Sequence, residues 1–284
     1  MKPLDISLNI VYSIGRHTAK GGNPVKQRRP RPNPLAGLCN AARDLLFPPR
    51  CVGCDELLPP FARRATVLCP LCRTAWETAV NEASEDAATD AARGLVYLVH
   101  YRPGHTDGIP EKLIYHLKHG GDPRAFSFVA ARLAPRLLNT AATLPTRLAE
   151  GEDQPILFTY PPRRRSAVRE DGFDQAERLA KALAATCGGD LATGASALIQ
   201  RTHRKAKEQK TLTAAQREAN ATSSYALSPK AAETVRDRTV VICDDLCTTG
   251  ATLNRCAALL VEAGARSVIL CTVARTDSHR GGKD

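Results

Sequence analysis

The second half of the chain alternates short apolar runs with segments that repeat apolar residues at helical spacing. The clearest apolar run is Thr239–Asp244 (TVVICD), whose length and β-branched residues predict a buried strand. Ile156–Tyr160 and Ser267–Val273 predict two more strands, and helical spacing predicts a helix at Phe173–Cys187. Strands that alternate with helices predict a parallel α/β sheet, which binds ligands beyond the carboxyl ends of its strands.

Further elements are predicted upstream of this alternation. Gly94–Tyr101 (GLVYLVHY) is apolar and contains β-branched residues, which predicts a single strand. Ile109–His119 and Phe126–Leu138 have apolar residues at helical spacing and predict two helices, with the turn Gly120–Pro123 between them. We therefore expect the main domain to begin near residue 94.

Polar segments connect the predicted strands and helices. Pro161–Gly172 is basic and predicts a loop, whereas Leu191–Ile199 predicts a short strand without clear limits. Arg201–Ser224 is polar and long for a connector, and loops of that length are usually functional or mobile. Thr248–Gly264 predicts a loop that leads into a helix.

Charge and composition divide the chain further. Residues 1–34 contain seven basic residues and one acidic residue, so they hold +6 of the formal net charge of +11. This basic, Pro/Gly-rich stretch predicts a disordered leader, which either binds polyanions or is only a solvated segment. Residues 76–93 are acidic and rich in alanine. We expect five parts: a disordered basic leader at 1–34, a cysteine module at 35–75, an acidic linker or exposed helix at 76–93, the main domain at 94–278 and a disordered tail at 279–284.

Apolar runs and cysteines indicate the compartment. No run approaches the roughly 18 residues that a membrane span needs. The N-terminus is a poor signal peptide, because polar residues interrupt its apolar positions and no small-residue cleavage site follows. Six of the ten cysteines are scattered through apolar segments, which favours buried free thiols and a reducing compartment. We therefore expect a cytoplasmic protein without membrane insertion.

The other four cysteines form two Cys-x-x-Cys pairs. Cys51 and Cys54 are followed, after fourteen residues, by Cys69 and Cys72. Each pair turns the backbone so that both sulfurs face one ion, and two pairs complete a tetrahedral zinc shell. With all four positions filled, such a site is structural and leaves no position open for catalysis. Because the segment is too short to build its own core, metal binding would supply its folding free energy.

The segment after the buried strand has the composition of an anion-binding loop. Asp244 and Asp245 come at the end of the strand, and Thr248–Thr252 (TTGAT) opens the next helix. Backbone N–H groups at a helix N-terminus bind phosphate, threonine hydroxyls add donors, and Gly250 lets the backbone approach the oxygens. A carboxylate one turn away can accept hydrogen bonds from two ribose hydroxyls. Each residue alone is more often part of an ordinary turn or cap, but together they predict a ribose 5-phosphate site.

Three further motifs lie between the two cysteine pairs and this loop. The first is a helix end with a basic residue before a glycine turn, the second is a basic loop that feeds a helix, and the third lies in the long polar connector. In chain order they are Leu113-x-x-x-Leu117-Lys118-x-Gly120-x-Asp122, the segment from Arg163 through Arg169 and Gly172-Phe173-Asp174-Gln175 to Ala180, and Gln209-x-x-Leu212-x-x-x-x-Arg217-x-x-Asn220.

In this order, the motifs resemble those of the ComF family of competence proteins over about residues 45–275. The resemblance implies an α/β fold in which a phosphoribosyltransferase-type parallel sheet with flanking helices, at 94–278, is preceded by a small four-cysteine zinc-ribbon module. It implies binding of phosphoribosyl pyrophosphate (PRPP) or a ribose 5-phosphate ligand, with magnesium bridging the pyrophosphate of PRPP. The family's association with natural transformation implies single-stranded DNA and competence or recombination proteins as partners.

The resemblance also implies roles for individual residues. The two acids would contact the ribose hydroxyls, the threonine loop would hold the 5-phosphate, a first loop would line the pyrophosphate position, and a mobile loop would close over it. The two acids are Asp244 and Asp245, and the threonine loop consists of Thr248, Thr249, Gly250, Ala251 and Thr252. The first loop contributes Arg163, Gly172, Phe173 and Gln175, and the mobile loop contributes Gln209, Arg217 and Asn220.

The first loop departs from the family pattern at two positions. Where the family usually has Arg-Gly-Phe-Asn-Gln, this chain has Asp171 and Asp174 in place of the cation and the amide. These two carboxylates would repel a polyanion unless Arg164, Arg165 and Arg169 compensate for them. These two departures therefore count more against catalysis on pyrophosphate than against ribose-phosphate binding.

Two functions remain open. One is an accessory protein of DNA uptake or single-stranded DNA handling that uses its PRPP pocket as a ligand or sensor site. Because only 5% of the residues are aromatic, its DNA binding would be mainly electrostatic. The alternative is an active phosphoribosyltransferase, a pentosyltransferase of nucleotide metabolism or salvage, although the sequence has no recognisable base-specificity hood. A regulator with PRPP as effector is less favoured, since no helix-turn-helix signal is found.

Overall fold

The computed structural model describes residues 48–59, 66–143, 155–188, 192–202 and 224–277. The predicted leader and tail lie outside these ranges. The strands are β1 (Leu95–Val96), β2 (Val99–Tyr101), β3 (Ile156–Thr159), β4 (Ala192–Ala195), β5 (Ile199–Arg201), β6 (Tyr225–Leu227), β7 (Thr239–Cys247) and β8 (Ser267–Thr276). The helices are α2 (Pro70–Glu82), α3 (Ser84–Ala91), α4 (Ile109–Tyr115), the π-helix η1 (His116–Gly120), α5 (Pro123–Thr143), α6 (Arg165–Asp171), α7 (Gln175–Cys187), α9 (Ala231–Val235) and α10 (Ala251–Glu262).

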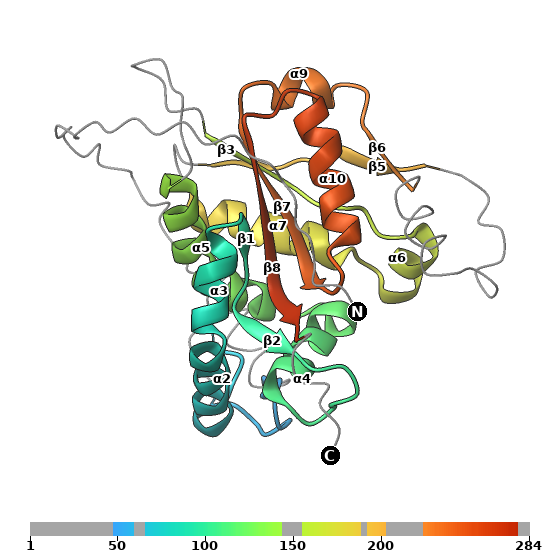
Figure 1. The fold of residues 1–284 in the computed structure, drawn as a ribbon. Helices are drawn as coiled ribbons and strands as arrows, with labels where there is room; N and C mark the ends of the chain where they lie inside the picture. Colours follow the sequence, from blue (N-terminus) through green and yellow to red (C-terminus); the bar gives the residue numbers. More distant parts are fainter. Residues whose placement is uncertain (1–47, 60–65, 144–154, 189–191, 203–223, 278–284) are drawn as a thin grey trace, which may run out of the picture.

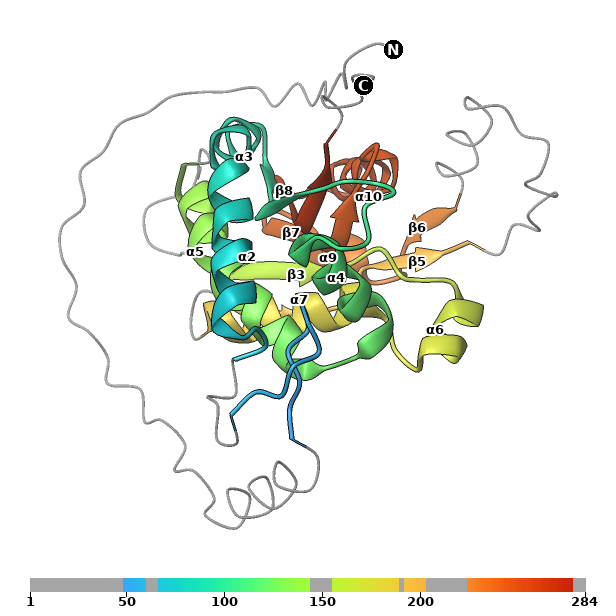
Figure 2. The ribbon, with the colours of Figure 1, turned by 90° about the horizontal axis from the view of Figure 1, so that it is seen from below.

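A parallel sheet forms the centre of the molecule, as predicted. Its order is β1-β8-β7-β3-β4, with β2 also paired to β8. Alternate residues of β7 point to opposite faces of the sheet. Val241 and Cys243 join the hydrophobic core under α5 and α7, whereas Val240 and Ile242 join the core under α9 and α10. Figures 1 and 2 show α10 on one side of the strands and α5 and α7 on the other.

The strand predicted at Gly94–Tyr101 is divided into β1 and β2. Both pair with β8, and Leu98 donates its N–H to the carbonyl oxygen of Val273 between them. The Tyr97 carbonyl instead accepts a hydrogen bond of 2.7 Å from the Arg136 guanidinium of α5. A side chain from another element therefore satisfies the backbone group at the break, and sequence pattern alone does not carry that information.

The helix predicted at Ile109–His119 changes from an α-helix to a π-helix before it ends. Its first part is α4, and its last turn is η1, which stops at Gly121 with a φ of +62°. Leu113, Ile114 and Leu117 of this stretch are buried. Single π-turns inside helices often mark functional positions, because the wider turn re-aims the side chains that it carries.

The acidic segment at 76–93 is helical in the structure. Most of it belongs to α2 and α3, and α2 already begins between the second pair of cysteines. Trp76 of α2 is fully buried, with its ring edge-on to Phe128 of α5 at a centroid distance of 5.8 Å. Asp90 of α3 is buried in an ion pair with Arg275 at the end of β8. These two helices are therefore packed against the main domain (Figure 1).

Two other predicted segments contain elements of their own. The basic loop at Pro161–Gly172 includes α6, and the stretch Leu191–Ile199 contributes β4 and the start of β5. β5 pairs antiparallel with β6 in a small separate sheet. Most of the polar connector Arg201–Ser224 lies outside the described residues. In the described part of the chain, none of the helices has the length and apolar character needed to span a membrane.

Candidate functional site

A polar cavity of about 330 Å³ lies beyond the carboxyl end of β3, beside the last residues of β7. This is where a parallel sheet is expected to bind ligands. Its lining combines residues from η1, the β3–α6 connection, α7, the β5–β6 sheet, β7 and α10. They are Lys118, His119, Pro161, Pro162, Arg163, Asp174, Gln175, Ala176, Arg201, Tyr225, Asp244, Asp245 and Thr252.

Asp244 and Asp245 reach the cavity because the neighbouring strand ends before them. The predicted strand at Thr239–Asp244 is longer than expected and continues to Cys247, still paired with β8. On the other side, the pairing with β3 ends at Ile242 and Thr159. The two acids therefore lie inside β7 but past the end of β3. Both residues line the cavity at this position.

The two carboxylates have different surroundings. Burial, and then the charge of Asp245, raise the pKa of Asp244 well above its ordinary value. Asp245 is 6% exposed, and its Oδ2 atom lies 3.4 Å from Nζ of Lys118. That oxygen is buried and has no hydrogen-bond partner among the described residues. The pair thus combines one acid whose pKa is raised by burial with one acid that lies beside a cation.

The threonine loop leads into α10 as predicted. α10 begins at Ala251 with Gly250 as its N-cap, at a φ of +73° that favours glycine. The N-cap residue supplies no side-chain hydrogen bond, and Thr249 Oγ1 accepts only a long bond of 3.4 Å from the Ala251 amide. Of the five predicted loop residues, Thr252 lines the cavity, whereas Thr248 and Thr249 are exposed beside it.

The carboxylate of Asp171 contacts two basic side chains. Its Oδ2 atom lies 2.6 Å from Nη1 of Arg163, and its Oδ1 atom lies 2.9 Å from Nδ1 of His119. The hydrogen bond from His119, followed by Arg163, lowers the pKa of Asp171, although desolvation opposes this shift. The expected compensation by Arg164, Arg165 and Arg169 is therefore replaced by compensation from Arg163 and His119.

Asp174 serves as the N-cap of α7. Its Oδ1 atom accepts hydrogen bonds from the amides of Ala176 and Glu177, at 3.0 and 3.3 Å, and its Oδ2 atom accepts one of 2.8 Å from the Arg163 amide. An aspartate at this position is therefore explained by capping, which fixes the backbone of the first loop. The carboxylate nevertheless lines the cavity and adds negative charge to its wall.

The predicted first-loop residues divide into two groups. Arg163 and Gln175 line the cavity, and the buried Oε1 atom of Gln175 has no hydrogen-bond partner among the described residues. Phe173 is buried in the core, edge-on to Phe126 and beneath the Arg178 guanidinium. Gly172 ends α6 at a φ of +78°. The structure thus gives Phe173 and Gly172 packing and turn positions outside the cavity wall.

Arg201 and Tyr225 also line the cavity, although they are not among the site residues predicted from the sequence. Arg201 Nη1 donates a hydrogen bond of 2.9 Å to the Tyr225 hydroxyl, and its guanidinium lies 4.9 Å from the ring centroid. They flank the polar connector at the ends of β5 and β6, which could have been the signal for them. The predicted mobile-loop residues Gln209, Arg217 and Asn220 lie in that connector, outside the described residues.

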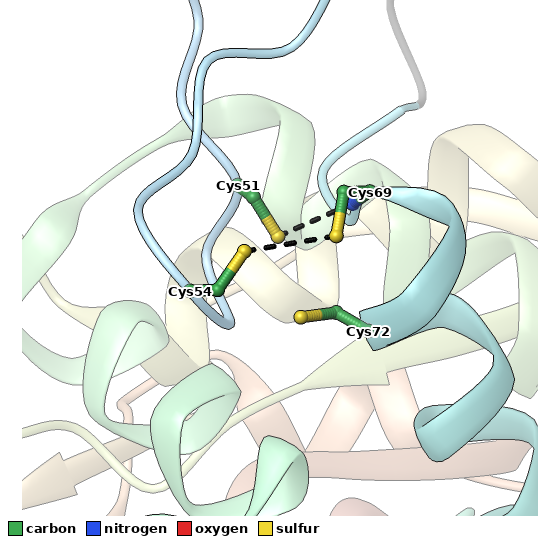
Figure 3. Close-up of side chains that lie close together, drawn as sticks. All are labelled: Cys51, Cys54, Cys69 and Cys72. Atoms are coloured by element: carbon green, nitrogen blue, oxygen red, sulfur yellow. Dashed lines mark hydrogen bonds between the residues drawn. The ribbon is translucent and has the colours of Figure 1, made fainter.

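The four cysteines form a compact cluster at the other end of α4. The sulfurs of Cys51, Cys54, Cys69 and Cys72 lie within 4.8 Å of one another and face a common centre (Figure 3). Zn–S bonds of about 2.3 Å place the sulfurs of a tetrahedral site about 3.8 Å apart, so the cluster fits a zinc ion closely. The amides of Gly53 and Cys69 donate to Cys51 Sγ at 3.4 and 3.2 Å.

Backbone hydrogen bonds prepare one of these thiols for metal binding. Burial raises the pKa of Cys51, but the backbone amides of Cys69, Cys54 and Gly53 lower it. The resulting pKa of Cys51 is about 7. Burial and the neighbouring sulfurs instead raise the pKa of Cys72. A metal ion binds thiolates, so its charge would have to replace the proton of Cys72. The donor set is one that can hold a metal such as zinc.

Comparison with known proteins agrees with this fold. The family model described as "Phosphoribosyl transferase domain" matches residues 168–284. No curated protein matches the chain. Among solved structures, the crystal structure of TT1426 from Thermus thermophilus is similar at 15% sequence identity, over 55% of this chain and 86% of that chain, with a TM-score of 0.28.

The sheet and the family match together define the class of fold. The chain contains a phosphoribosyltransferase-type domain, with a mostly parallel sheet and flanking helices, and a four-cysteine cluster lies ahead of it. This fold class is the one predicted from the sequence. A fold of this class supports the binding of PRPP, and proteins with such domains usually use magnesium.

Proposed function

We propose that this protein binds PRPP or another ribose 5-phosphate ligand in the cavity beside β7. The observation that carries the proposal is the meeting of three features in one cavity: the acid pair Asp244 and Asp245, Thr252 at the N-terminal end of α10, and a wall of cations. The acids suit ribose hydroxyls, and the helix end suits the 5-phosphate. Lys118, Arg163 and Arg201 suit further anionic groups of the ligand.

The roles of the remaining residues are part of the same proposal. Thr248, Thr249, Gly250 and Ala251 would complete the phosphate loop with backbone amides and hydroxyls. Magnesium would arrive with PRPP, bound to the pyrophosphate. Gln175 supports this arrangement, because its unpartnered Oε1 atom lines the cavity and can accept a hydrogen bond from a ligand or its hydration shell.

Calorimetry with PRPP and magnesium tests this proposal. We expect the double variant Asp244→Ala/Asp245→Ala to lose most of the affinity of the wild type, because the ribose hydroxyls lose their acceptors. Asp107→Ala, at an exposed position outside the cavity, is the matched control and should bind like the wild type. Equal affinities in all three proteins would refute the proposed site.

For the cellular role, we propose a ComF-like accessory protein of DNA uptake or single-stranded DNA handling in the cytoplasm. Support comes from the order of a four-cysteine cluster and a phosphoribosyltransferase-type domain, and from the net charge of +11. In this proposal the metal module covers about residues 35–75 and the transferase-type domain covers 94–278. Competence or recombination proteins are the proposed partners.

An active phosphoribosyltransferase is the second candidate. The cationic wall of the cavity favours it, because a ligand with a second anionic group, such as PRPP, would make use of Lys118 and Arg163. Reaction would proceed by displacement of pyrophosphate, with positioning and magnesium as the main catalytic factors. Release of pyrophosphate from PRPP with any one of a panel of bases would support this function. Binding of PRPP without release across the panel would favour the accessory role.

A further inference from the structure

One cation lies closer to the acid pair than its position in the chain suggests. Lys118 is separated from Asp245 by more than a hundred residues, yet its Nζ atom lies 3.4 Å from Oδ2 of that acid. It is carried by the π-turn η1, the last turn of the helix that begins with α4. Leu117, the preceding residue, is fully buried and fixes this turn against the core.

The acid pair needs a counter-ion. Asp244 and Asp245 are adjacent, and burial together with the charge of Asp245 raises the pKa of Asp244. Lys118 is the one cation among the described residues that forms an ion pair with either acid. Its contact with Asp245 is an ion pair without a hydrogen bond, so Oδ2 retains an unused acceptor position inside the cavity.

That unused position has the chemistry of a site for a hard divalent cation. Magnesium and manganese prefer carboxylate oxygens, and they keep water molecules that the rest of a polar cavity can hydrogen-bond. Lys118 and a divalent cation would compete for the same oxygen, because two positive charges close to Oδ2 repel each other. The Gln175 amide oxygen, also buried and unpartnered, lines the same cavity and can accept from the water shell of such an ion.

We propose that Lys118 is the internal counter-ion of the ribose-binding acids and takes the place of a divalent cation in the empty cavity. This inference rests on the proposed function. When PRPP binds with its magnesium, the ion pair between Lys118 and Asp245 breaks, and Lys118 contacts the anionic part of the ligand. Lys118 would therefore weaken the binding of a free divalent cation and strengthen the binding of the magnesium–PRPP complex.

Titration calorimetry with Mn²⁺ alone, and separately with PRPP and Mg²⁺, tests this role. In Lys118→Met, we expect Mn²⁺ affinity to rise on the order of tenfold, the effect of removing one nearby charge. We expect affinity for PRPP with Mg²⁺ to fall in the same variant. Lys118→Arg keeps the charge and should stay close to the wild type in both titrations. Lys112→Met, on α4 and outside the cavity, is the matched control.

The outcomes separate this inference from the proposed function. An Mn²⁺ affinity in Lys118→Met that is unchanged or lower than that of the wild type overturns the counter-ion role, whatever PRPP does. If Mn²⁺ affinity rises but no protein binds PRPP, the counter-ion role stands and the proposed function fails. Should Lys118→Met not fold, Lys118→Gln removes the same charge and gives the same comparison.

Discussion

At the residue scale, two aspartates show how the first loop combines structure with charge. Asp174 caps α7 and also accepts the Arg163 amide, so it holds the backbone of the loop on both sides of α6. Asp171 holds the side chains of Arg163 and His119. The basic side chains at this end of the cavity are therefore positioned by carboxylates, which also add negative charge where a polyanionic ligand would bind.

Replacement of Asp171 should strengthen the binding of a polyanion. Asp171→Asn removes one negative charge near the cavity and releases Arg163 and His119 from their ion pairs. We expect PRPP affinity to increase on the order of fivefold, because one negative charge near the ligand is removed. The gain should shrink as salt is added. A weaker ligand affinity in calorimetry would mean that Asp171 acts mainly by orienting Arg163.

Asp244 should make the empty protein less stable at neutral pH. Burial and Asp245 raise its pKa in the folded state, so the folded protein binds more protons than the unfolded chain above the ordinary aspartate pKa of about 3.9. The stability associated with this group is complete below that pH and decreases as the pH rises towards the folded-state pKa. Asp244→Asn removes the titrating group, so this decrease in the free energy of unfolding with rising pH should disappear.

We therefore expect Asp244→Asn to unfold at a higher temperature than the wild type at pH 7, and at a similar temperature at pH 4. In a domain of this size, 1 kcal/mol corresponds to about 2–4 °C. Asp237→Asn, at an exposed turn, removes the same charge and serves as the control. If the unfolding temperature of Asp244→Asn at pH 7 is not higher than that of the wild type, burial does not destabilise the ionised form of Asp244.

At the scale of elements, the cysteine cluster and the cavity lie at the two ends of one helical stretch. A side-chain β-carbon at Gly53 would lie 2.7 Å from Cys72 Sγ and 2.8 Å from Cδ1 of Ile109, the first residue of α4. The first cysteine pair, Cys51 and Cys54, is therefore in close contact with both α2 and α4. Nine residues after Ile109, the same stretch delivers Lys118 to the cavity.

Gly53→Ala should therefore disturb both the metal module and α4. The added methyl group would meet a sulfur ligand and a core side chain at distances that neither tolerates, so one of them must move. We expect a lower unfolding midpoint, with a loss of about 1–3 kcal/mol as for other overpacked sites, and faster release of metal to a chelator. Gly104→Ala has open space around it and is the spatial control, although its φ of +87° carries a backbone strain of its own. Metal analysis and thermal unfolding would check both results.

The elements that were predicted well are those whose patterns are local. β7, α7 and α10 have clear apolar periodicity, and glycine or aspartate residues mark their ends. Their sequences therefore leave few alternative assignments of secondary structure. The break between β1 and β2 was not predicted, because it depends on Arg136 reaching the Tyr97 carbonyl from another helix. For the same reason, the π-turn that carries Lys118 and the placement of Arg201 and Tyr225 in the cavity could not be derived from local patterns.

At the scale of the whole molecule, the positive charge is divided unevenly. Residues 1–34 hold +6 of the net +11, and the cavity is lined by Lys118, Arg163 and Arg201 together with three aspartates. The polar connector, the leader and the roles of Gln209, Arg217 and Asn220 remain predictions. The fold class followed from the alternation of strands and helices, whereas no local pattern indicates a partner.

The proposed binding of single-stranded DNA should depend strongly on salt concentration. Each phosphate contact releases counter-ions, so the logarithm of affinity should fall linearly with the logarithm of salt concentration. Removal of residues 1–34 takes away most of the excess charge, and we expect it to reduce both the affinity and the slope. Fluorescence anisotropy of a labelled oligonucleotide across salt concentrations measures both. A complex that is insensitive to salt would contradict the proposed electrostatic mode.

The position of Trp76 has a practical consequence. It is the single tryptophan of the chain, and it lies on the helix that begins at the second cysteine pair, enclosed against Phe128 of the main domain. Its emission spectrum therefore reports on one internal boundary without any label. A red shift on chelation, before the rest of the molecule unfolds, would reveal separation of the cysteine cluster from the sheet as a distinct event.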